Sequence, residues 1–145
     1  MQRPIEYENL IKTQALEAVA ATPGAIAGFL ANAEDYKSGA HMLDASMKMQ
    51  VFTLAYEGYF QLVQAVLEFY GVRAKDAGRN LVIQRVSSSP GLDANEFSFI
   101  TTAHKRRNGM SYSTPFPPVT RAEAATMRDI LSKYLPAARA LTQTH

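Results

Sequence analysis

A long apolar stretch with few charges, between residues 44 and 70, most constrains how this chain can fold. Between Met49 and Tyr70 the only formally charged residues are Glu57 and Glu68. Apolar residues recur there at alternating steps of four and three, which is a helical period, and a second apolar set fills most of the remaining circumference. A helix that is apolar nearly all round is a buried one, so we expect residues 44–70 to form the central helix of a bundle.

The ends of this central helix carry capping signals. Asp44 is a candidate N-cap because a carboxylate can accept the unpaired amide protons of a first turn, and Gly71 can adopt the left-handed conformation that ends a helix. A membrane-spanning role is not expected, since Tyr56, Gln61 and the mid-span Glu57 are poorly suited to lipid.

The length and the absence of cysteine narrow the class of protein. A chain of 145 residues suffices for one domain, 1–145, with a sizeable core, and no cysteine is present to form disulfides or thiolate metal sites. The first residues show no apolar run or cleavage pattern that indicates secretion, so we expect a cytoplasmic location. His41 and His145 show no metal-ligand spacing and no glycine-rich phosphate loop follows a strand, so no metal or cofactor is expected.

The rest of the first half reads as two helices and a loop. A proline in a first helical turn and a threonine-proline pair predict helices over residues 4–21 and 22–30, followed by a loop over 34–41. After the central helix we expect a polar turn over residues 72–78. Residues 79–86 fit a short helix, but the three β-prone residues 81–83 leave a strand open.

The second half carries two capping boxes. Asp93 with Glu96 opens a helix that we expect to end near Tyr112, and Thr120 with Glu123 opens a last helix. Pro136 should kink or restart that last helix because it lacks an amide proton. These elements predict an all-α fold, a bundle of four to six helices.

Charge is distributed unevenly along the chain. The net charge is −4 over residues 1–72 and +4 over residues 73–107. A basic segment of this kind can mark a polyanion-binding face. The alternative is ordinary solvated helix ends, which the charge count alone favours.

One polar face stands out on the helix that Asp93 opens. His104, Arg107, Asn108, Ser111 and Tyr112 are three or four residues apart and share one side. Polar groups that extend a core-facing stripe need partners in the fold, in a second subunit or in a ligand, because leaving them unpaired costs about 1 to 3 kcal/mol each. The alternative is a helix C-terminus with cations at its negative dipole end and locally satisfied polar groups.

Two segments give the chain a resemblance to the HEPN superfamily. Residues 93–113, which end in Arg-Arg-Asn-Gly-Met-Ser-Tyr at 106–112, look like the signature region of that family. Residues 55–71, an Ala-Tyr-Glu segment leading to a glycine turn, resemble its central helix. The similarity extends from about residue 42 to residue 141.

The resemblance implies an up-and-down helical bundle that forms a two-fold homodimer with its motif faces apposed. It also implies an RNA-cleaving toxin or effector of a toxin–antitoxin or defence system, with a nucleotidyltransferase as partner protein. The family's motif is Arg-x-x-x-x-His. Arg107 matches its arginine and Asn108 its polar neighbour, while Tyr112 stands in the position of the histidine.

That departure bears on the chemistry of a metal-independent endoribonuclease. Such cleavage needs a group that takes the 2′-hydroxyl proton, and a phenol with a reference pKa of about 10 is a poor base unless nearby cations lower that pKa. His104 is a candidate substitute base, or else a core or interface residue. The candidate catalytic residues are therefore Arg107, Tyr112 and His104, and the candidate RNA or phosphate ligands are Arg106, Asn108, Lys105 and Ser111.

A second function class stays open. The same face also fits a non-catalytic helical dimerisation or interaction module, in which Arg107 and Asn108 fix the geometry of the bundle. A helical adaptor for a nucleotidyltransferase is a third interpretation of these residues.

Overall fold

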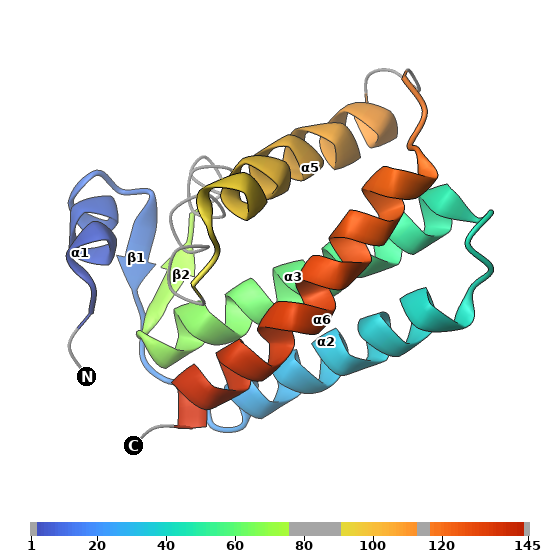
Figure 1. Ribbon diagram of the computed structural model, residues 1–145. Coiled ribbons are helices and arrows are strands. Elements are labelled where there is room, and N and C mark those ends of the chain that lie inside the picture. Colours follow the sequence, from blue (N-terminus) through green and yellow to red (C-terminus); the bar gives the residue numbers. More distant parts are fainter. Residues whose placement is uncertain (1–2, 76–90, 113–116, 144–145) are drawn as a thin grey trace.

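The computed structural model shows a mostly helical protein (Figure 1), and in the residues that it describes five helices pack together beside a small two-stranded antiparallel sheet. It describes residues 3–75, 91–112 and 117–143, with the backbone alone for 108–112. The elements in chain order are α1 (Ile5–Lys12), β1 (Leu16–Ala18), α2 (Ala25–Met42), α3 (Lys48–Phe69), β2 (Val72–Ala74), α5 (Ala94–Tyr112) and α6 (Arg121–Gln143).

The central helix is confirmed as α3. It lies against α2 and α6, and eleven of its residues are buried, among them Phe52, Tyr59 and Leu62. Gly71 has a φ of 68° and follows the end of the helix, as predicted. The predicted N-cap is wrong, because the Asp44 carboxylate accepts a hydrogen bond from the Ser46 amide at 2.8 Å and α3 begins only at Lys48.

The three long helices α2, α3 and α6 approach most closely at Gly58. A Cβ atom at this position would lie 2.6 Å from Cδ2 of Leu131 on α6 and 2.9 Å from Cβ of Tyr36 on α2. Real Cβ contacts are essentially never this short, so the crossing of the three helices depends on a residue without a side chain.

The predicted helix over residues 4–21 is wrong in its second half. The chain turns at Gln14, which has a φ of 66°, and β1 then pairs antiparallel with β2, so that Leu16 lies opposite Ala74. This small sheet also replaces the start of the predicted polar turn over residues 72–78, and it corrects the all-α prediction. Burial decides the outcome, since Leu16 is fully enclosed when it points from β1 into the core.

The predicted loop over residues 34–41 is also wrong, because α2 continues through it as far as Met42. The helix buries Leu30, Ala33 and Ala40 along one side, and a Cβ atom at Gly39 would lie 3.4 Å from Cδ1 of Leu54 on α3. Packing against α3 and α6 therefore overrides the turn propensity of Ser38 and Gly39.

Both predicted capping boxes are confirmed. The Asp93 amide donates to the Glu96 carboxylate at 3.0 Å while the Glu96 amide donates to Asp93 at 2.8 Å, and Thr120 and Glu123 exchange the same two bonds at 3.0 and 3.1 Å. The helix α5 ends at Tyr112, as expected. A restart at Pro136 is wrong, since α6 runs through this exposed proline as one helix.

The helix or strand predicted for residues 79–86 lies outside the described residues. Among the helices that are described, none is long and apolar enough to span a membrane.

Candidate functional site

The helix α5 carries the candidate residues and packs against both α3 and α6. In Figure 1 it runs along one side of the bundle, with α3 and α6 beneath it. Ile100 and Ala103 bury their side chains, so the polar residues that follow them are also directed towards the other helices.

His104 is a buried polar residue, with 5% of its surface exposed. Its Nδ1 atom is hydrogen-bonded to the hydroxyl of Tyr56 on α3, and the centroids of the two rings are 6.0 Å apart. This bond pairs two polar groups that would each be costly to bury alone. His104 reaches the core rather than the solvent, so the geometry makes it a residue that positions α5.

Arg107, one turn further along α5, forms an ion pair with the next residue of α3. Its NH2 atom lies 2.8 Å from Oε1 of Glu57, and the two side chains are 30% and 24% exposed. His104 and Arg107 therefore do share one face, as predicted, and that face meets the consecutive residues Tyr56 and Glu57. We call these four residues the α3–α5 polar cluster.

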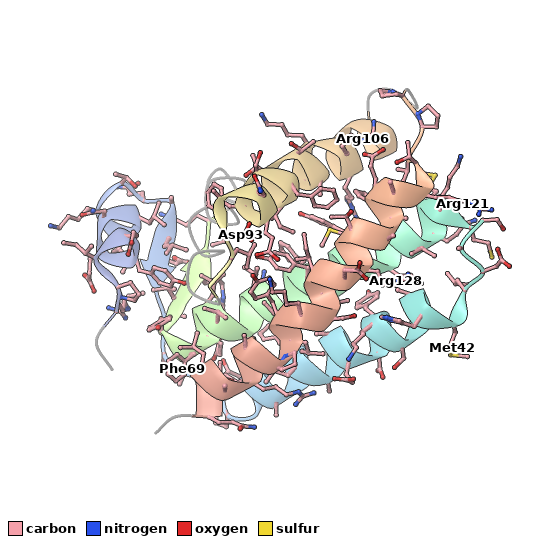
Figure 2. The ribbon with its side chains drawn as sticks, in the orientation of Figure 1. Met42, Phe69, Asp93, Arg106, Arg121 and Arg128 are labelled. Carbon is pink, nitrogen blue, oxygen red and sulfur yellow. The ribbon has the colours of Figure 1, made fainter. Side chains whose placement is uncertain are left out.

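Arg106 points in a different direction. Its Nε and NH2 atoms each lie 3.1 Å from an oxygen of Glu123, and its guanidinium also donates to the carbonyls of Pro117 at 2.7 Å and Pro118 at 3.1 Å. A paired guanidinium–carboxylate contact of this kind fixes orientation as well as charge. Arg106 thus fastens α5 to the start of α6, and Figure 2 shows it near the C-terminal end of α5.

The remaining candidate residues divide into two groups. The side chain of Lys105 is exposed to solvent. Asn108, Ser111 and Tyr112 belong to α5, but their side chains lie outside the described part of the structure.

The first turn of α5 is anchored to α6 by Glu96. Its carboxylate accepts hydrogen bonds from the Tyr134 hydroxyl and, at 3.0 Å, from Lys133 Nζ. Desolvation raises the pKa of Glu96, but the hydrogen bonds from Tyr134, the Asp93 amide and Lys133 outweigh it and lower that pKa to about 2. The same contact with Glu96 is the largest cause that raises the pKa of Lys133.

Sequence reasoning missed Tyr56 and Glu57 as members of the site. One signal was available, because Glu57 is a charged residue in the middle of an otherwise apolar helix, and a half-buried carboxylate requires a cationic partner. The side of α3 on which that partner lies depends on the packing of α5, which the local pattern does not specify.

No family model and no curated protein matches this chain. In residues 3–75, 91–112 and 117–143, no group of three or more histidine and acidic side chains is placed to hold a metal ion.

Proposed function

We propose that this chain is a HEPN-like helical protein that engages RNA or a nucleotide phosphate at the C-terminal half of α5. The observation that supports this proposal is the α3–α5 polar cluster. It holds a partly exposed guanidinium on Arg107 in a fixed orientation, next to the turn of α5 that carries Asn108, Ser111 and Tyr112.

The cluster gives each residue a distinct part in the proposed binding. Arg107 supplies planar donors of the kind that suit a phosphate, and Glu57 holds them in place until the ligand competes for them. His104 and Tyr56 keep α5 in register with α3 from within the core. Arg106, with its guanidinium on Glu123 and two carbonyls, supports the end of α5 rather than the ligand.

A homodimer would place two copies of α5 across one groove, and a nucleotidyltransferase-type partner in a cytoplasmic toxin–antitoxin or defence system would fit a HEPN-like protein. Metal-independent ribonuclease activity would require Tyr112 to act with Arg107, because His104 is buried. A chelator-insensitive cleavage of labelled RNA that is lost in Tyr112→Phe would establish it.

Binding is tested by measuring the fluorescence anisotropy of a labelled single-stranded RNA. We expect Arg107→Gln to weaken binding about tenfold, and Arg73→Gln, an exposed arginine of β2, to leave it nearly unchanged. Glu57→Gln should tighten binding, because it removes the carboxylate that competes with the phosphate for Arg107. Unchanged affinity in both Arg107→Gln and Glu57→Gln would refute a phosphate site at the cluster.

A second candidate function is a non-catalytic dimerisation or interaction module. The observation that favours it is that the guanidinium groups of both Arg106 and Arg107 have carboxylate partners within the chain. For such a module, Arg107→Gln and Glu57→Gln would lower thermal stability or the dimer fraction in sedimentation, and no variant including the wild type would bind RNA.

A further inference from the structure

A second cationic surface lies on α6, away from the α3–α5 polar cluster. Arg121, Arg128 and Arg139 are spaced seven and eleven residues apart, which places them within about 20° of one line along a helix of 3.6 residues per turn. The line faces α2, because Arg139 pairs with Glu34 at 3.2 Å and Ser132, on the same side, contacts Nε2 of His41 at 3.4 Å. Figure 2 shows Arg121 and Arg128 on α6, towards the end where that helix begins.

Arg128 is the exceptional member of this row. Of the half-buried arginines in the described residues, Arg3, Arg106, Arg107 and Arg139 all have hydrogen-bond or ion-pair partners in the chain. Arg128 has none among those residues, and its Nε atom is buried without an acceptor. Burying an unpaired donor costs free energy, so moving this guanidinium towards an external carboxylate would recover it.

The seam between α2 and α6 carries excess positive charge. Arg139 and Lys37 both lie within ion-pair distance of the single carboxylate of Glu34. Hydrogen bonds from Ser46, and to a smaller extent the charge of Arg121, lower the pKa of Asp44 at the other end. These charged residues of the seam sum to a net charge of +2, from four cations (Arg121, Arg128, Arg139 and Lys37) and two carboxylates (Glu34 and Asp44).

An apolar hollow continues the same seam beyond Arg139. It has a volume of about 470 Å³ and is lined by Ile26, Ala27 and Leu30 of α2 and by Arg139 and Thr142 of α6. Arg139 therefore joins an apolar recess on one side to a row of cations on the other. The complementary shape is a segment with apolar side chains at one end and carboxylates at the other.

We propose that the seam between α2 and α6 binds an acidic amphipathic helix of a partner protein. Its apolar side chains fill the hollow beside Arg139, and its carboxylates pair with Arg128 and Arg121. These two arginines are about 10 Å apart along α6, which matches two glutamates seven residues apart on the bound helix. This inference is independent of the proposed phosphate site, since it uses none of the residues of the α3–α5 polar cluster.

The probes are two labelled helical peptides of about 20 residues, each with a glutamate pair seven residues apart and leucines at one end or the other. Binding is measured by anisotropy at about 50 mM NaCl, against peptides in which glutamine replaces glutamate. We expect one glutamate peptide to bind about tenfold more tightly than its glutamine control. Arg128→Gln should reduce that difference to about threefold or less, because only the Arg121 pair remains, whereas Arg73→Gln and Arg107→Gln should preserve it.

A charge swap protects the test against a merely unfolded variant. Arg128→Glu should bind a peptide in which one lysine replaces the glutamate that faces residue 128. Its thermal unfolding should be no lower than that of the wild type, because the buried Nε atom of Arg128 has no hydrogen-bond acceptor to lose. Equal binding of the glutamate and glutamine peptides, or an Arg128→Gln variant with unchanged affinity, would overturn the proposal. The proposal would also be overturned if Arg128→Gln lost RNA binding or self-association and kept peptide binding. The occupant of the seam would then be a nucleic acid or a second copy of the chain.

Discussion

Substituting Gly58 with alanine tests the three-helix crossing directly. The new methyl group would lie 2.6 Å from Leu131 Cδ2 and 2.9 Å from Tyr36 Cβ. The leucine terminus can rotate away, but the Tyr36 Cβ is fixed to the backbone of α2, so that helix has to move. Overpacking of this kind typically costs about 1 to 3 kcal/mol.

Gly28→Ala in α2 is the matched control. A Cβ at Gly28 meets nothing within 4 Å, and replacing a helical glycine with alanine gains about 0.5 to 1 kcal/mol in each variant. The common gain cancels in the comparison, which leaves the steric cost at Gly58. At about 3 °C per kcal/mol for a chain of this size, Gly58→Ala should melt roughly 3 to 9 °C below Gly28→Ala.

The assay is thermal unfolding followed by circular dichroism, with urea unfolding as a second measure of the free energy. Circular dichroism of the native state should show the same helix content in both variants. Equal melting temperatures would contradict the reasoning, because they would mean that α2, α3 and α6 do not converge at Gly58.

Three further substitutions test the contacts that hold α5. Because the folded pKa of Glu96 is about 2, below its ordinary value of 4.5, the stability that it provides is complete above pH 4.5 and lost as the pH falls towards 2. Glu96→Gln should flatten that acid limb by about 1 to 3 kcal/mol in urea titrations, and an unchanged limb would contradict the assignment. Arg106→Lys should lower stability by about 1 to 3 kcal/mol, since an ammonium cannot reproduce the paired contact with Glu123, and a melting temperature equal to the wild type would refute it. Tyr56→Phe should lower the free energy of unfolding by about 1 to 3 kcal/mol, because Nδ1 of His104 would stay buried without the tyrosine hydroxyl. The control Lys105→Ala changes an exposed residue of the same helix and should be nearly neutral.

The parts of the fold that sequence predicted well are those fixed by local chemistry. Each capping box joins two residues three apart in the chain, so Asp93 with Glu96 and Thr120 with Glu123 determine where α5 and α6 begin without help from tertiary contacts. The central helix was equally predictable, because its apolar circumference fits only a buried helix.

The parts that sequence missed depend on distant partners. Residues Leu16–Ala18 and Val72–Ala74 are separated by all of α2 and α3, and three-residue strands are too short for an alternating pattern to be recognised. The continuation of α2 through Ser38 and Gly39 likewise depends on packing against helices later in the chain.

For the candidate site, the sequence predicted which residues share one side of α5, but it did not predict the residues that they contact. Helical spacing alone placed His104 and Arg107 on one side of α5. The adjacent Arg106 is only one residue away, yet its contacts with Glu123 and the carbonyls before α6 give it a separate structural role. The partners Tyr56 and Glu57 came from the tertiary arrangement of α3.

Charged contacts provide much of the attachment of α5 to the rest of the protein. Of its described side chains, Ile100 and Ala103 are the buried apolar ones, while the charged residues Glu96, Arg106 and Arg107 link it to α3 and α6. Added salt screens partly exposed ion pairs but leaves apolar burial intact. Rising ionic strength should therefore free the amides of α5 for hydrogen–deuterium exchange while those of α3 stay protected, so that this helix behaves as a separately releasable arm of the protein.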